Sequence, residues 1–80
     1  MKTTKYFDHI RLRPDRATIN NNWIQDVVLK PIKTSIQSDG RIRKWGYIKE
    51  VDKYLRVILL EDGETVHNAF FDRTFKENKP

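Results

Sequence analysis

The sequence predicts an α+β domain in which two short helices pack on a three- or four-stranded antiparallel sheet. Three strand-like runs follow one another between residues 40 and 75, and short connections rich in turn residues join them. An apolar stripe with helical spacing comes earlier, between residues 20 and 30. This order, helices first and then a series of hairpins, is typical of an α+β fold.

The length and composition indicate one folded unit. Eighty residues suffice for a single domain, and a second unit would bury too little apolar surface to fold. We expect residues 6–75 to form the ordered part, with residues 1–5 and 76–80 as loose termini. The chain has no cysteine, which excludes disulfides and thiolate metal sites and is compatible with the cytoplasm.

The charge of the chain points to polyanionic partners. No apolar run approaches the roughly 20 residues that span a bilayer, and the first residues lack the apolar centre of a secretory signal. We therefore expect a soluble cytoplasmic protein without membrane association. The net charge of +5 favours attraction to RNA or to an acidic protein.

Two helices are expected before the sheet. A short helix begins near Tyr6 and is expected to end at Pro14, because the residue before a proline is pushed out of the helical region. The second helix is capped within Asn20–Asn22 and ends before Pro31. Its apolar stripe is formed by Trp23, Ile24, Val27 and Val28.

Three or four strands, the last over residues 65–71, are expected from the remaining pattern. A short strand over residues 34–37 precedes the turn at residues 38–40, and a second strand follows over residues 41–48. Residues 54–60 are apolar on both alternations, which favours a central strand covered on both faces. In residues 41–48, two arginines and two aromatics alternate with the other side chains and should share one face of the sheet.

The last hairpin fixes a predicted register. Asp62–Gly63 is typical of a two-residue hairpin turn. That turn places Arg56 opposite Ala69 and His67 opposite Ile58. His67 and Arg56 would then be diagonal neighbours on one face.

The chemistry-bearing residues are compatible with RNA binding or metal-free RNA cleavage. Phosphate-binding loops, dinucleotide motifs, metal-ligand clusters and serine elbows are absent from the sequence, so no cofactor or metal is expected. His9 and His67 are the candidate proton donor and acceptor, since the pKa of histidine lies near neutrality. The candidate phosphate-binding cations are Arg13, Arg16, Arg41, Arg43 and Arg56.

Each candidate also has a structural interpretation. A lone histidine on a half-buried strand is often merely packed, and Arg41 and Arg43 also suit a solvated strand face. Trp45 and Tyr47 can stack on bases, but burial under a helix is the favoured interpretation of a tryptophan in so small a core. The pair Asp72–Arg73 suits a salt-bridged strand end.

The motifs HIRLRPDRATI, WIQDVVLKP, DGRIRKWGYI and YLRVILLEDGETVHNAFFDRTF resemble a family of short bacterial, largely cyanobacterial domains of unknown function. The resemblance covers residues 6–75. That family is distantly similar to toxin-type ribonucleases of the RelE, BrnT and colicin-nuclease group. The resemblance implies helices on a small antiparallel sheet and points to His9, to Arg13 or Arg16, and to Arg43, Arg56 and His67.

Two functions follow as hypotheses. The first is a binding module whose basic sheet face binds RNA or an acidic protein partner. The second is a metal-independent endoribonuclease of toxin type, whose partner would be an antitoxin. Binding is slightly favoured over catalysis.

Overall fold

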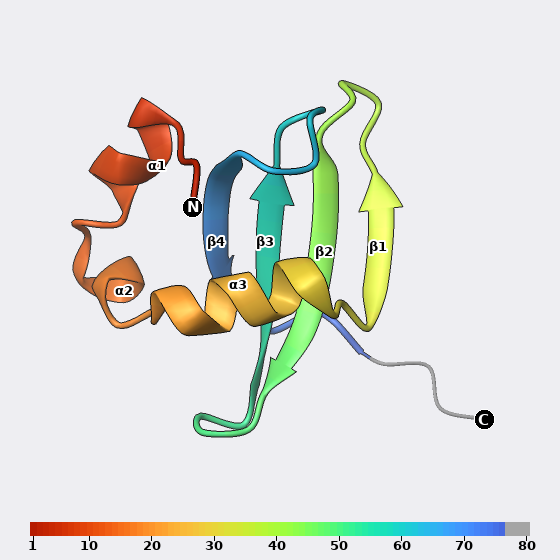
Figure 1. Cartoon of the computed structure of the whole chain (residues 1–80). Helices are drawn as coiled ribbons and strands as arrows, with labels where there is room; N and C mark the ends of the chain where they lie inside the picture. The colour runs from red at the N-terminus through yellow and green to blue at the C-terminus, as the bar shows by residue number, and fades with distance from the viewer. Residues whose placement is uncertain (77–80) are drawn as a thin grey trace.

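The structure is a computed structural model of the chain, and it describes residues 1–76. The strands form one antiparallel sheet in the order β1-β2-β3-β4, so each strand pairs with its neighbour in the sequence (Figure 1). This arrangement confirms the predicted α+β class. The elements are α1 (Lys5–Ile10), α2 (Pro14–Ala17), α3 (Asn21–Leu29), β1 (Lys33–Ile36), β2 (Ile42–Ile48), β3 (Lys53–Leu59) and β4 (Val66–Phe71).

The N-terminal region forms two short helices where one was predicted. The hydroxyl of Thr4 accepts a hydrogen bond from the Phe7 backbone N–H and caps α1. α1 ends at Ile10, before Pro14, and Pro14 is instead the first residue of α2. Proline suits that position because the first helical N–H has no partner within the helix. The described chain therefore has three helices, not two.

α3 follows the prediction closely. The side chain of Asn20 accepts a hydrogen bond from the Asn22 backbone N–H and begins the helix. The helix ends at Leu29, two residues before Pro31. Ile24 and Val27 are buried against the sheet.

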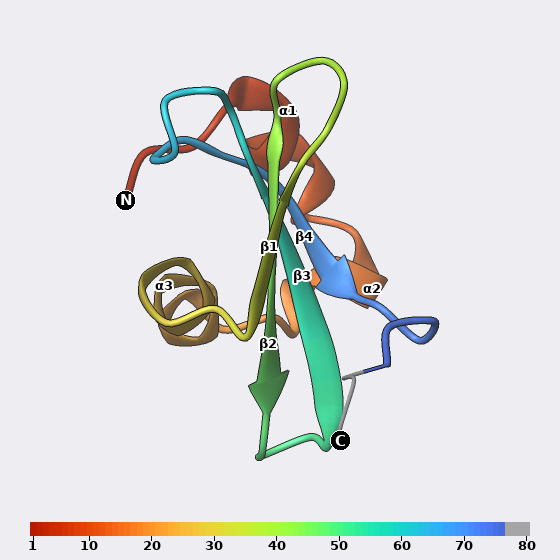
Figure 2. The ribbon, with the colours of Figure 1, turned by 90° about the vertical axis from the view of Figure 1, so that its right-hand side faces the viewer.

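The two faces of the sheet are covered differently, as Figure 2 shows in a view along the sheet edge. α3 crosses one face and packs on β2 and β3. We call this the covered face; its buried strand residues include Ile48, Leu55, Val57 and Leu59. A Cβ atom at Gly46 would lie 2.7 Å from Cγ2 of Val27, so only glycine allows α3 to approach this closely. The other side, which we call the open face, has no helix across β1, β2 and β3.

The chain before α1 is paired with the sheet, although residues 1–5 were expected to be loose. Thr3 forms a parallel bridge with Val66. The Thr4 N–H donates to the Val66 carbonyl at 3.0 Å, and the Val66 N–H donates to the Lys2 carbonyl at 2.9 Å. These bonds and the packing of α1 on β4 cover the β4 edge of the sheet. Of the expected C-terminal tail, residues 77–80 lie outside the described part.

The β3–β4 connection is longer than a two-residue hairpin. The Leu60 N–H still donates to the Thr65 carbonyl at 2.9 Å, which leaves residues 61–64 as the loop. Asp62 accepts hydrogen bonds from the backbone N–H groups of Glu64 and Thr65, as in an Asx turn. Gly63 supplies the positive φ of +70° that this turn needs.

The predicted β3–β4 register is wrong beyond the first pair. Leu59 lies opposite Val66, as predicted, but the register then shifts by one residue. His67 is the extra residue of a β-bulge in β4. Arg56 therefore lies opposite Phe70 and not Ala69, and His67 is not paired with Ile58.

Candidate nucleic-acid interface

A row of alternating cations and aromatic rings crosses the open face. Antiparallel pairing places Lys33 opposite Trp45, Trp45 opposite Arg56, and Arg56 opposite Phe70. Directly opposed residues share a face, so the four side chains lie next to one another. α2 adds Arg16 at the end of the row. We call Lys33, Trp45, Arg56, Phe70 and Arg16 the alternating row.

The distances in the alternating row are those of cation–π contacts. The Lys33 Nζ lies 5.9 Å from the centroid of the Trp45 ring, and the Arg56 guanidinium carbon lies 5.3 Å from it. The same Arg56 carbon is 5.1 Å from the Phe70 centroid, and that of Arg16 is 5.2 Å from it. Each ring thus has a cation on either side, within the range of about 6 Å that gives attraction.

Trp45 is buried, but not under a helix as expected. Its exposed fraction is 6%. Phe75 stacks on the indole with 5.2 Å between the ring centroids, and Arg43 lies 5.6 Å from the Trp45 centroid. The chain after β4 and the cationic side chains therefore provide the cover that a helix provides on the other face.

Asp72 fixes two members of the alternating row, Trp45 and Arg56, by accepting hydrogen bonds from both. One carboxylate oxygen, Oδ2, accepts hydrogen bonds from Trp45 Nε1 at 3.0 Å and from Arg56 Nη2 at 2.8 Å. The other oxygen accepts from the backbone and hydroxyl of Thr74. Burial by itself raises the pKa of Asp72, but the hydrogen bonds from Trp45, Thr74 and Arg56 outweigh it and hold the pKa well below its usual range. The partner of Asp72 is thus Arg56, across the sheet, and not the adjacent Arg73.

On the open face, the cations without a carboxylate partner in the described residues lie on β1 and β2. Arg56 is paired with Asp72, and Arg16 Nε is 3.4 Å from a carboxylate oxygen of Asp15. In contrast, Lys33 and Arg43 form no ion pair with any carboxylate in residues 1–76. The Arg43 Nε donates only to the Ser35 hydroxyl, at 3.0 Å. These two cations are available to an anion from solution.

The structure brings together some of the sequence-predicted cations and separates others. Arg16, Arg43 and Arg56 all reach the open face, and Arg16 also donates to Asn68 Oδ1 at 2.7 Å. Arg41 lies at the start of the β1–β2 hairpin's second arm, with its Nε 3.7 Å from Asp39. Arg13 is exposed beside α2, and its side chain contacts no other polar group or ring in the described residues.

The two histidines occupy different surroundings and make no contact with each other. His9 is exposed on the last turn of α1. His67 stacks on Tyr6, with 4.8 Å between the ring centroids, and its Nδ1 lies 3.0 Å from the Thr4 hydroxyl. Burial lowers the pKa of His67, and the charge of Arg41 lowers it further while Asp39 partly opposes this. His67 is therefore a neutral, packed side chain at neutral pH.

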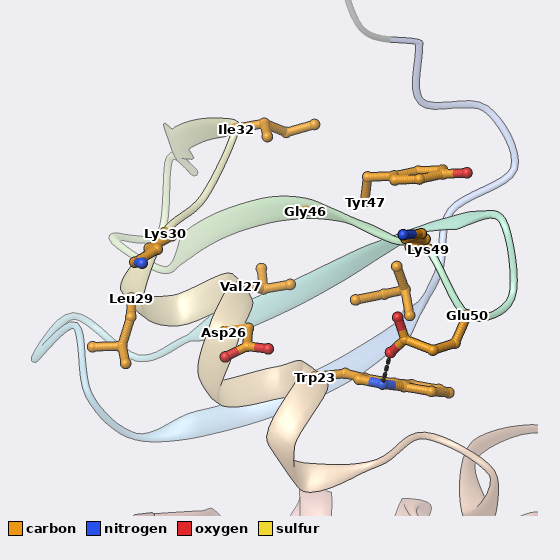
Figure 3. Close-up of a pocket in the computed structure, with 11 residues that line it drawn as sticks. Trp23, Asp26, Val27, Leu29, Lys30, Ile32, Gly46, Tyr47, Lys49 and Glu50 are labelled. Atoms are coloured by element: carbon orange, nitrogen blue, oxygen red, sulfur yellow. Dashed lines mark hydrogen bonds between the residues drawn. The ribbon is translucent and has the colours of Figure 1, made fainter.

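A surface pocket lies on the other side of the sheet, between α3 and β2 (Figure 3). Its volume is about 450 Å³. Trp23 closes one end, and its Nε1 donates to Glu50 at 2.8 Å. Acidic and basic groups are both present on its rim: Asp26, Lys30, Lys49 and Glu50. This mixed rim gives the pocket no preference for a polyanion.

Sequence reasoning missed Lys33, Phe70 and Asp72. Lys33 becomes recognisable only when β1 is aligned with β2, and Phe70 only after the bulge at His67 is known. Asp72 had a visible signal, an acidic residue at a strand end, but its partner was taken to be its neighbour in the sequence.

Comparison of the chain with protein-family models, with curated proteins and with solved structures gave no match. Within residues 1–76, no helix has the length and apolar content to cross a bilayer. The same residues contain no group of three or more metal-ligating side chains.

Proposed function

We propose that this protein is an RNA-binding module that binds single-stranded RNA along the open face. The observation that carries the proposal is the alternating row, in which cations and rings from four strands and α2 form one continuous surface. This proposal retains the binding hypothesis drawn from the sequence and narrows it to a particular surface.

The chemistry of the open face suits a single strand. Within residues 1–76, Lys33 and Arg43 have no carboxylate partner, and each can neutralise a phosphate. Farther along the same face of β2, two residues beyond Trp45, Tyr47 is 46% exposed; its ring lies 5.4 Å from that of Tyr54 and its hydroxyl donates to Asp52. An exposed ring on a face that carries cations is a surface on which an unpaired base can stack with little sequence preference.

The geometry supports binding over cleavage. An acid–base pair must reach the same phosphate, but His9 and His67 lie in separate surroundings and neither belongs to the alternating row. His67 already has Tyr6 over its ring and Thr4 at Nδ1. The toxin-type endoribonuclease is therefore the alternative that the experiment below also tests.

The test uses two double variants that remove the same charge from opposite sides of the sheet. Lys33→Gln with Arg43→Gln changes the open face, and Lys30→Gln with Lys49→Gln changes the rim of the α3 pocket. Fluorescence anisotropy with a labelled 12-nucleotide RNA in EDTA, repeated at several salt concentrations, gives the affinity and its salt dependence. The open-face variant should bind at least about tenfold more weakly, with a log–log salt slope reduced by about 1.4. The affinity of the pocket variant for the RNA should fall by about threefold or less.

Three results would contradict the proposal. Equal losses in the two double variants would mean a diffuse charge effect without a defined face. Absence of binding by the unmodified protein at low salt would exclude RNA as the ligand. Cleavage of the RNA in EDTA that disappears in His67→Ala would establish the endoribonuclease.

A further inference from the structure

The two edges of the sheet differ in whether another segment pairs with them. The β4 edge is paired with residues 2–4 and packed against α1. At the other edge, β1 pairs with β2 on one side, and nothing in residues 1–76 pairs with its outer side (Figure 1). An unpaired strand edge is a template on which another extended chain can hydrogen bond.

The outward backbone groups of β1 can be identified from the register. The Gln37 N–H donates to the Arg41 carbonyl across the hairpin at 2.8 Å. Because hydrogen-bonded residues alternate in an antiparallel pair, Ser35 and Lys33 also direct their backbone groups toward β2. The N–H and C=O groups of Thr34 and Ile36 therefore face outward.

Apolar side chains border this edge on the side of the covered face. Ile36 is opposite Ile42 and is 71% exposed, because α3 does not reach this end of the strand. Leu29, at the end of α3, is 78% exposed, and Ile32 is 43% exposed. On the open-face side the same strand presents Lys33 instead. The edge thus has Lys33 on its open-face side and exposed apolar side chains on its covered-face side, where Lys44 also lies opposite Thr34.

The positive charge around the β1 edge favours a partner strand of opposite charge. Residues 29–44 contain five lysines and arginines and one carboxylate, Asp39, which is already paired with Arg41. A second copy of this chain would bring two such clusters together, and like charges across a strand pair are destabilising. A strand that carries carboxylates is complementary.

We propose that β1 is a docking edge for an extended acidic segment of a partner protein. The segment adds antiparallel or parallel to β1 as a fifth strand and forms hydrogen bonds with the backbone of Thr34 and Ile36. Its alternate residues are carboxylates that face Lys33 and Arg43, and apolar side chains that face Ile36 and Ile32. This site overlaps the proposed RNA surface at Lys33 and Arg43 and differs from it in using the outward backbone groups of β1.

The experiment uses a defined peptide probe. The probe is a capped peptide of the sequence Glu-Val-Glu-Ile-Glu-Val-Glu, and its control is Glu-Glu-Val-Ile-Val-Glu-Glu, which has the same charge without the alternation. Binding is followed by amide hydrogen exchange of the ¹⁵N-labelled full chain. The alternating peptide should slow exchange of the Thr34 and Ile36 amides at least about tenfold, and the control peptide should not.

Variants at Thr34 separate strand addition from simple charge attraction. Thr34→Pro removes an outward N–H without removing a bond to β2, and proline is tolerated on an edge strand. It should weaken peptide binding at least tenfold, while Thr34→Ala should stay within twofold. Lys33→Glu, which leaves the backbone unchanged, should also abolish binding, and it tests the charge complementarity of the edge. If the proline variant does not fold, the comparison of the two peptides on the unmodified protein still separates strand addition from charge attraction.

The proposal is overturned by any of three outcomes. The two peptides bind equally well, which would mean charge attraction alone. Neither peptide binds at millimolar concentration. Sedimentation shows a dimer that Thr34→Pro dissociates, which would make a second copy of the chain the occupant of the edge.

Discussion

The covered and the open faces of the sheet come from the same strands but are stabilised in different ways. In β2, Ile48 points to α3 and is buried, and Gly46 lies against Val27. The alternate residues, Arg43 and Trp45, point to the open face. One face is held by apolar packing, and the other by cation–π contacts and one buried carboxylate.

The covered face contributes mainly to stability, and the open face carries the groups that we propose to bind RNA. The covered face excludes water and supplies most of the hydrophobic stabilisation, since its central residues Leu55, Val57 and Leu59 are fully buried. The open face keeps its cations fixed but leaves Lys33 and Arg43 without carboxylate partners in the described chain. Substitutions on the two faces should therefore differ in kind as well as in size.

The largest effect is expected from truncating a residue of the covered face. Leu55→Ala should lower the free energy of unfolding by about 2–5 kcal/mol, because it leaves a cavity under α3. Ile58→Ala, on the partly exposed open face of the same strand, should cost about 1 kcal/mol. Urea unfolding followed by circular dichroism measures both. Equal losses would contradict the assignment of the core to the α3 side.

Gly46→Ala tests the close approach of α3. The added Cβ would lie 2.7 Å from Val27 Cγ2, and we expect destabilisation of about 1–3 kcal/mol. Combining it with Val27→Ala should restore part of the loss, because the clashing methyl group is removed. A double-mutant cycle of urea midpoints tests this, and strictly additive effects would show that the two residues do not touch.

Asp72→Asn tests the anchor of the open face. The variant leaves the Arg56 guanidinium without its carboxylate, and we expect a loss of about 1–3 kcal/mol at neutral pH. Because the pKa of Asp72 is lowered in the folded state, its contribution is present above the usual carboxyl pKa and is lost as the pH falls below it. The unfolding free energy of Asp72→Asn should therefore decline less between pH 5 and pH 2 than that of the unmodified protein. An equal decline of the unfolding free energy in both proteins would contradict the proposed role of the Asp72 hydrogen bonds.

The smallest effect is expected at His67. Its pKa is lowered by burial and by Arg41, so the unfolded chain binds the proton more readily than the folded one. Stability from this group is present above pH 6.5 and is lost as the pH falls through the lowered folded pKa. Thermal unfolding of His67→Gln between pH 7.5 and pH 5 should show a flatter dependence than the unmodified protein. His9→Gln, which removes the exposed histidine of α1, is the matched control.

Local patterns predicted most of the fold. The Asn20 cap, the apolar stripe of α3 and the alternation of side chains between the two faces at β2 each depend on neighbouring residues, and the structure has all three. Pro14 was misassigned because proline both ends and begins helices, and the sequence does not show which role it takes. The register error had a different origin: the bulge at His67 adds one residue to β4 without glycine or any other local sign.

The candidate site was less predictable because it depends on pairing between distant segments. The arginines at positions 43 and 56 were identified as cations, but their common surface with Lys33 and Phe70 requires three strand registers at once. Asp72 was assigned to its sequence neighbour, whereas its hydrogen bonds come from β2 and β3. The alternation of side chains along one strand can be predicted from neighbouring residues. The order of side chains across the sheet depends on the register between distant segments.

The two tryptophans allow the central claim to be tested in one spectrum. Trp45 belongs to the open face, and Trp23 lies on the α3 side with its Nε1 bound to Glu50. The two indole N–H resonances of the ¹⁵N-labelled protein can be followed during titration with a single-stranded RNA. We expect the Trp45 resonance to shift or broaden while that of Trp23 stays in place. A shift of Trp23 alone would place the RNA on the covered side and contradict the account.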